Sequence, residues 1–134
     1  MMDIKNLKNI FENKKILYVE DDEYLCEVNR ESLEVFCNNV FIALDGKIGL
    51  EIFEKNQDIE LILTDVTMEE MDGIEMALKI KEINPNIIII ARTSHSEQYL
   101  KDNFPKYNEN VFNHILQKPF DFVDLFGVLG KYFS

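Results

Sequence analysis

The residues best suited to chemistry in this sequence stand where short apolar segments end. Asp65 follows the run Leu61-Ile62-Leu63-Thr64 and leads into a loop that closes with the turn pair Asp72-Gly73. Three other apolar segments end in polar pairs, namely Glu20-Asp21, Thr93-Ser94 and Lys118-Pro119. These segment ends supply carboxylates, a hydroxyl and an ammonium, without a Ser-His-Asp or Cys-His-Asp set.

The elements that position these residues follow a regular alternation. Five apolar segments with strand character alternate with segments of helical periodicity. Strands are expected at 16–19, 40–43, 61–64, 87–91 and 113–116, and helices around 25–36, 48–53, 73–83 and 96–104 and from 120 to about 132. Each crossover is long enough for a right-handed βαβ unit, so the sequence predicts an α/β fold with a doubly wound, five-stranded parallel sheet. Residues 1–13 are expected to form a helical N-terminal extension, and residues 14–134 a single domain.

Composition narrows the function classes. The formal net charge is −11, and Arg30 and Arg92 are the only arginines, which argues against direct nucleic-acid binding. No apolar run reaches the roughly 18 residues that a membrane-spanning helix needs, and no signal peptide precedes the domain. Cys26 and Cys37 lie eleven residues apart without metal-site spacing, as expected for reduced, buried thiols in the cytoplasm. The many Asn, Lys and Ile residues are typical of an AT-rich bacterial genome.

The polar strand ends are expected to meet at one edge of the sheet. In doubly wound folds the working site lies beyond the carboxyl ends of the strands. Glu20, Asp21 and Asp65 would repel one another there unless a cation sat among them, and oxygen-only ligands suit Mg²⁺. Lys118 would supply a point charge and Thr93 a hydroxyl donor to a phosphoryl group. Asp65 is left as the nucleophile that forms an acyl phosphate.

Four motifs in this order resemble the receiver domain of two-component response regulators over residues 14–133. They are Ile16-Leu17-Tyr18-Val19-Glu20-Asp21-Asp22, Asp65 with Met68-x-x-Met71-Asp72-Gly73, Thr93-Ser94, and Lys118-Pro119-Phe120. The resemblance implies the flavodoxin-like strand order 2-1-3-4-5. It also implies a signalling switch, not a metabolic enzyme, that receives its phosphoryl group from a histidine kinase or a phosphotransfer protein. We expect the receiver to stand alone.

The resemblance implies a role for each site residue. Asp65 would be the phosphoacceptor, Thr93 the switch hydroxyl and Lys118 the phosphate-binding lysine. Mg²⁺ would be held by four groups, namely Glu20, Asp21, Asp65 and the backbone carbonyl of Thr67. Asp21 would be a direct ligand and Glu20 would act mainly through water. The bond between Lys118 and Pro119 is expected to be cis.

Several residues depart from the usual receiver pattern. Glu69 replaces a customary Pro, Ile115 replaces the aromatic residue that commonly rotates inward, and Arg92 replaces an apolar residue and therefore needs a partner or solvent. The region between 93 and 118 is longer than usual. These changes cluster near the expected output face, formed by the helix at 96–104, the strand at 113–116 and the last helix, where an unknown downstream protein would bind.

Other interpretations stay open at this point. Asp22 and Glu23 also suit a helix N-terminus. His95 and Thr67 are hypothesised to control water access to the acyl phosphate. An aspartyl-phosphate hydrolase would use a similar residue set, but it would place a second Asp at the position of Thr67 and add a cap domain. A phosphorylation-independent binding module and a receiver belonging to a longer regulator are the remaining alternatives.

Overall fold

A single parallel sheet forms the centre of the computed structural model, which describes residues 3–118 and 122–133. Its strands are β1 (Lys15–Val19), β2 (Asn39–Ala43), β3 (Leu61–Asp65), β4 (Ile88–Thr93) and β5 (His114–Gln117). They pair in the order β2-β1-β3-β4-β5, and every pairing is parallel. The predicted fold class and strand order are thereby confirmed. Pro119, at the expected cis bond, lies outside the described residues.

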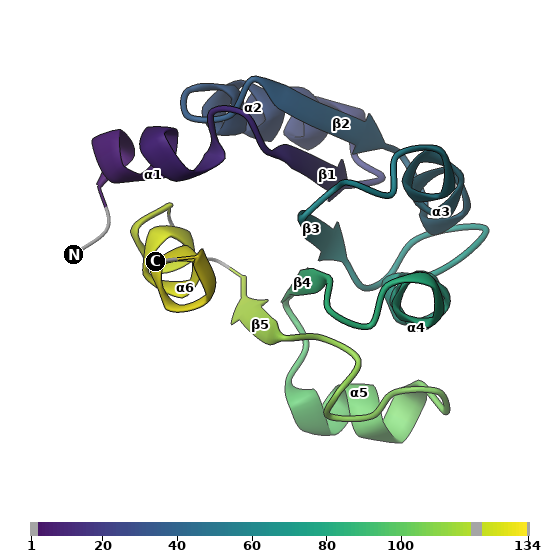
Figure 1. Ribbon diagram of the computed structural model, residues 1–134. Coiled ribbons are helices and arrows are strands. Elements are labelled where there is room, and N and C mark those ends of the chain that lie inside the picture. The colour runs from purple at the N-terminus through teal and green to yellow at the C-terminus, as the bar shows by residue number, and fades with distance from the viewer. Residues whose placement is uncertain (1–2, 119–121, 134) are drawn as a thin grey trace.

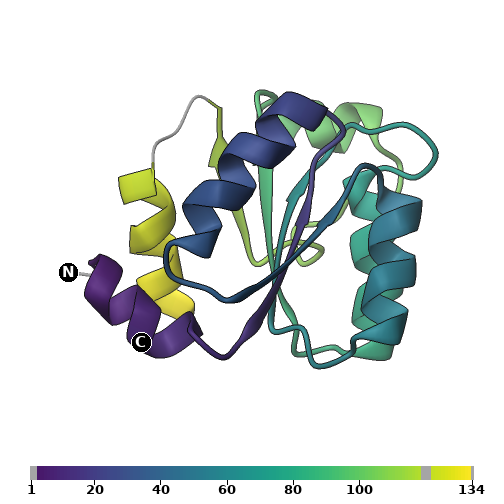
Figure 2. The same cartoon turned by 90° about the horizontal axis from the view of Figure 1, so that it is seen from above.

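Helices cover both faces of the sheet (Figures 1 and 2). They are α1 (Ile4–Phe11), α2 (Glu23–Glu34), α3 (Gly46–Lys55), α4 (Gly73–Ile83), α5 (Glu97–Asn103) and α6 (Phe122–Phe133). Buried side chains of α1, α2 and α6 pack with alternate strand residues on one face, and those of α3, α4 and α5 pack on the other. All five residues of β3 are buried, because this central strand is covered on both faces.

Alternation along the strands decides which residues face which helical layer. In β1, Tyr18 belongs to the core beneath α1, α2 and α6, whereas Leu17 and Val19 belong to the core beneath α3, α4 and α5. In β4, Ile90 and Ala91 divide between the two cores in the same way. Successive side chains of a strand point to opposite faces, so the residues at the strand ends inherit the same division.

Acidic N-caps fix where several helices begin. Asp22, Asp45 and Asp72 each accept a hydrogen bond from a backbone N–H three residues later, at 3.1, 2.8 and 2.8 Å. The expected helix-start role of Asp22 is confirmed. Leu25, Val28 and Leu33 have the spacing of one helical face, but Leu25 and Val28 are exposed. With Asp22 as the cap, α2 instead turns Cys26 and Leu33 into the core, which leaves Leu25 and Val28 on the outer face.

The N-terminal helix α1 is part of the packed interior. Leu7 and Phe11 are fully buried, and the Phe11 ring makes edge contacts with the rings of Phe36 and Phe133 at centroid distances of 5.8 and 4.9 Å. The backbone N–H of Asn38 also donates to the carbonyl that follows α1, at Glu12. The helix expected in this stretch therefore lies against α2 and α6, as Figure 2 shows.

Within residues 3–118 and 122–133, no helix is both long enough and apolar enough to cross a lipid bilayer.

Candidate functional site

The site forms where the carboxyl ends of β1, β3, β4 and β5 meet. Asp65 and Thr93 are the last residues of their strands, whereas the sequence-based bounds ended these strands at residues 64 and 91. Asp65 pairs in register with Arg92 on β4. Thr64, just before Asp65, pairs with Val19, which comes just before Glu20. Alternation therefore turns Glu20, Asp65, Arg92 and Lys118 toward the α2 and α6 layer.

Three carboxylates gather at this edge. Oxygens of Glu20, Asp21 and Asp65 all lie within 4.8 Å of one another. Glu20 and Asp65 are 1% and 5% exposed, whereas Asp21 is open to solvent. Burial, together with the neighbouring Asp65 carboxylate, raises the pKa of Glu20 well above its usual range. A cation would relieve this repulsion between the carboxylates. Their ligand atoms are all oxygens, which are the ligands that Mg²⁺ prefers.

The carboxylates open into a pocket of about 260 Å³. Thr67, in the loop after β3, lines this pocket, as do Thr93, Ser94 and His95 from the end of β4. The structure thus brings every sequence-predicted site residue to one place: Glu20, Asp21, Asp65, Thr67, Thr93 and Lys118. Their roles in chemistry stay predictions.

Lys118 forms the direct contact to the central carboxylate. Its Nζ lies 3.0 Å from Asp65 Oδ1, and the lysine side chain is one-third exposed. The backbone N–H of Lys118 donates to the carbonyl of Thr93 at 2.7 Å, which fixes the end of β5 to the end of β4. The ammonium is therefore held beside Asp65 by sheet geometry, at a place where it can neutralise an oxygen of an incoming anion.

Thr93 is engaged with the loop that follows it. Its Oγ1 accepts a hydrogen bond from the backbone N–H of His95 at 3.0 Å. The His95 ring stacks on Tyr99 of α5, with centroids 4.0 Å apart and planes 13° apart. The hydroxyl expected to act as the switch is thereby joined to the start of α5.

The loop after β3 folds closely against the backbone of Asp65. The Gly73 N–H donates to the carbonyl of Val66 at 2.7 Å, and a Cβ at Gly73 would overlap the carbonyl oxygen of Asp65. Glu70 has a φ of 63°, in the left-handed region. Glu69, where receivers usually have Pro, is exposed. Because the start of α4 lies so close to the backbone of Asp65 at the end of β3, position 73 requires glycine.

Arg92 has a partner that the sequence did not identify. Its Nη1 lies 3.4 Å from Glu20 Oε1 and also donates to the hydroxyl of Tyr18. Asn29 of α2 donates to the same hydroxyl at 2.7 Å, and the Tyr18 hydroxyl lies 3.3 Å from Glu20 Oε1. The two charged side chains are 11% and 2% exposed. The available signal was strand alternation, which puts Tyr18 and Glu20 on the same face.

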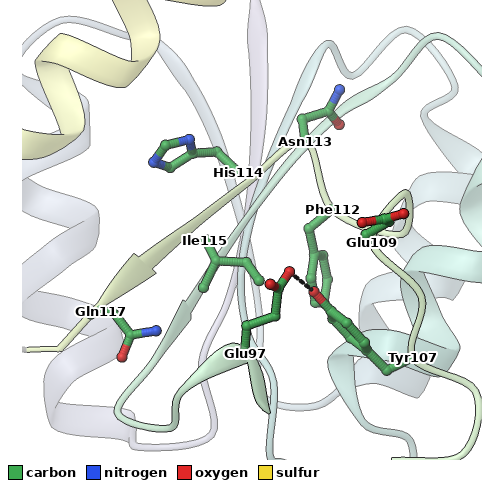
Figure 3. A pocket seen from close by; sticks show the side chains of 8 residues that line it. All are labelled: Glu97, Tyr107, Glu109, Phe112, Asn113, His114, Ile115 and Gln117. Atoms are coloured by element: carbon green, nitrogen blue, oxygen red, sulfur yellow. Dashed lines mark hydrogen bonds between the residues drawn. The ribbon is translucent and has the colours of Figure 1, made fainter. Parts of the chain in front are cut away.

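A second pocket, of about 310 Å³, lies between α5 and β5 (Figure 3). Ile115, at the position usually occupied by an aromatic residue, lines it together with Phe112. The Tyr107 hydroxyl donates to Glu97 Oε2 at 2.7 Å across its wall. Burial, followed by this contact, raises the pKa of Tyr107 above its usual range. The pocket is thus lined by the aromatic ring of Tyr107, from the loop before β5, whereas position 115 itself is aliphatic.

Relatives of known sequence are response regulators and related signalling proteins. The transcriptional regulatory protein ZraR of Escherichia coli K12 is 32% identical over 120 residues, which make up 90% of this chain and 26% of ZraR. The response regulator protein VraR of Staphylococcus saprophyticus is 32% identical over 107 residues, 77% of this chain and 49% of VraR. The chain therefore spans about a quarter of the length of ZraR and about half of the length of VraR.

Solved structures agree in fold. The N-terminal domain of an uncharacterized Wolinella succinogenes protein matches with a TM-score of 0.76 at 28% identity, covering 89% of this chain and 93% of that one. A response regulator receiver domain protein of Clostridium thermocellum gives the same TM-score and identity, with 88% and 92% covered. The Thermotoga maritima response regulator TrrA, solved with Mg²⁺ and BeF, matches with a TM-score of 0.74 at 24% identity, with 88% and 97% covered.

A comparison with protein families assigns residues 16–129 to the response regulator receiver domain, which is most of the 134-residue sequence. The matched segment runs from β1 into α6 and contains all the residues at the acidic edge of the sheet. The chain belongs to the family of response regulator receiver domains.

Proposed function

We propose that this receiver is a phosphorylation-controlled switch that accepts a phosphoryl group on Asp65 from a histidine kinase or a phosphotransfer protein. The observation that carries the proposal is the Lys118–Asp65 contact of 3.0 Å at the edge of a pocket lined by Glu20 and Asp21. A nucleophilic carboxylate, a cation for the phosphoryl oxygens and further acids for a metal are thereby together. The encounter would take place in the cytoplasm, and the expectation of a stand-alone receiver stays a prediction.

The chemical step follows from this arrangement. An oxygen of the Asp65 carboxylate attacks the phosphorus, and an acyl phosphate forms as the bond to the donor breaks. The leaving group departs with the bonding electron pair and takes up a proton. Lys118 neutralises one phosphoryl oxygen, and Thr93, whose hydroxyl oxygen now accepts from the His95 N–H, donates its own O–H to another.

Mg²⁺ fits the donor set of the pocket. Glu20, Asp21 and Asp65, with the carbonyl of Thr67, would hold it, and when bound it would offset the negative charge that accumulates on phosphoryl transfer. Without a metal ion, the closely spaced carboxylates oppose the approach of an anion. The reaction is therefore expected to depend on a divalent cation. The protein acts as a phosphoacceptor with self-catalysed transfer and hydrolysis.

The proposed output face comprises α5, β5 and α6. The second pocket lies on this face, between α5 and β5 (Figure 3). Among the described residues lining this pocket, Glu97 and Glu109 are acidic, Phe112 and Ile115 are apolar, and none is Lys or Arg. We expect a downstream protein that presents a basic residue beside an apolar one. Phosphorylation would shift an existing equilibrium of this face through the movement of Thr93.

The experiment is intact-mass measurement after incubation with acetyl phosphate, with and without Mg²⁺. We expect a Mg²⁺-dependent gain of one phosphoryl group in the natural protein and no gain in Asp65→Asn. Asp58→Asn is the matched control, because Asp58 is an exposed carboxylate paired with Lys15 and does not line the pocket. A control receiver that becomes modified while this chain does not would overturn the proposal and favour a phosphorylation-independent binding module.

A further inference from the structure

The acidic pocket contains a cation of its own besides Lys118. The Arg92 guanidinium lies against Glu20, with Nη1 3.4 Å from Oε1, and both side chains are nearly inaccessible to solvent. Arg92 also lines the pocket of about 260 Å³ that holds Asp21 and Asp65. A guanidinium in this place is permanently charged, since arginine does not lose its proton in proteins.

Several contacts hold the guanidinium in position. Nη1 donates to the Tyr18 hydroxyl, which also accepts from Asn29 Nδ2 at 2.7 Å. The guanidinium carbon lies 5.7 Å from the centroid of the Tyr18 ring, close enough for a cation–π interaction. On the other side, Glu20 Oε2 accepts from the backbone N–H of Asp22 at 3.3 Å. Arg92 and Glu20 are thus fixed from β1 and α2 as well as by their own pairing.

The charge balance of the pocket follows from these positions. Glu20, Asp21 and Asp65 bring three carboxylates, and Lys118 and Arg92 bring two cations. A divalent ion entering the pocket is attracted by the carboxylates and repelled by the guanidinium. Because the Coulomb energy scales with the product of the charges, the guanidinium repels Mg²⁺ about twice as strongly as a monovalent ion at the same distance. The net effect of Arg92 on cation binding is unfavourable.

We propose that Arg92 is a positioning residue that acts as a built-in counter-ion of Glu20 and weakens Mg²⁺ binding to the unphosphorylated receiver. This inference rests on the proposed function, since it assigns Mg²⁺ to the pocket. Arg92 orients the Glu20 carboxylate in the absence of metal and limits the occupancy of the pocket by the ion. The receiver therefore needs a higher Mg²⁺ concentration for phosphorylation than the same pocket would need without the guanidinium.

The test is direct titration of the unphosphorylated protein with MgCl₂ by calorimetry at constant ionic strength. Arg92→Met removes the charge and keeps an unbranched side chain. We expect it to tighten Mg²⁺ binding roughly tenfold, as the loss of a unit charge close to a divalent ion implies. Arg92→Lys keeps the charge and should stay within about twofold of the natural protein. Arg30→Met is the matched control, because it removes the same charge from α2, where Arg30 pairs with Glu27.

The outcomes separate this inference from the proposed function. Tighter binding in Arg92→Met alone supports the inference, since the loss of a purely structural contact would weaken binding or leave it unchanged. Unchanged or weaker binding in a folded Arg92→Met overturns it, even if the natural protein is phosphorylated on Asp65. If circular dichroism shows that Arg92→Met is unfolded, Arg92→Gln, which can still donate to Glu20, must show the same tightening. If no variant binds Mg²⁺, the inference fails, and absence of phosphorylation in the parallel mass measurement would reject the proposed function as well.

Discussion

Replacing Phe11 by Ala should destabilise the whole receiver, although Phe11 lies outside the expected domain boundary at residue 14. The ring is fully buried and lies at edge-contact distance from Phe36 and Phe133. Deleting a buried Phe side chain lowers the free energy of unfolding by about 3–5 kcal/mol, through lost transfer energy and the cavity left behind. For 134 residues the unfolding entropy is about 0.28 kcal/mol/K, so Tm should fall by roughly 11–18 °C.

Chemical and thermal unfolding, followed by circular dichroism, measure this loss. Tyr24→Ala is the control, because the Tyr24 side chain is 76% exposed and its removal should change the free energy of unfolding by about 0.5 kcal/mol or less. A loss below about 1 kcal/mol for Phe11→Ala would refute the reasoning. Residues 1–13 would then be a detachable extension, as the sequence-based boundary supposes, and not a structural part of the domain.

Other predictions test the site and its surroundings. Gly73→Ala should lower the free energy of unfolding by about 1–3 kcal/mol and slow phosphorylation, because the new methyl group would overlap the Asp65 carbonyl. Urea unfolding measures the first effect and intact mass the second, and an unchanged free energy of unfolding with an unchanged phosphorylation rate would contradict the described loop. Burial lowers the pKa of His114, so the folded state binds fewer protons than the unfolded state and stability falls as pH drops through the unfolded value. His114→Asn should therefore lose less Tm than the natural protein between pH 7.5 and 5.5, and an equal loss would count against this. Replacing Thr67 and His95 together by Ala should admit water and shorten the phosphoryl lifetime several-fold, as followed by mass; an unchanged decay rate would remove the idea.

Much of the fold was predictable because local and global signals agree. Apolar runs at 61–64 and 87–91 indicated strands, and turn residues such as Asp72 marked where helices begin. The sequence also placed Asp65 and Lys118 at one sheet edge, since the carboxyl ends of parallel strands meet there. The structure brings their charged atoms to 3.0 Å.

What escaped prediction depends on contacts between elements. The charge of Arg92 signalled the need for a partner, but its pairing with Glu20 crosses the strand between them and depends on the reach of a long side chain. The burial of α1 depends on α6, which lies at the other end of the chain. The exposure of Leu25 and Val28 depends on where α2 begins, and a shift of one residue rotates a helix by about 100°. Periodicity alone does not specify these three features.

Arg92 and Thr93 are adjacent in β4, yet they belong to opposite sides of the sheet. Arg92 reaches Asn29 of α2 through a shared tyrosine hydroxyl, whereas the Thr93 hydroxyl bonds to the backbone of His95 just before α5. These two neighbours at the end of β4 thus contact two layers that have no helix in common. We expect substitutions of Arg92 to disturb the contacts of the α2 layer and substitutions of Thr93 to disturb those at the start of α5, each without the other.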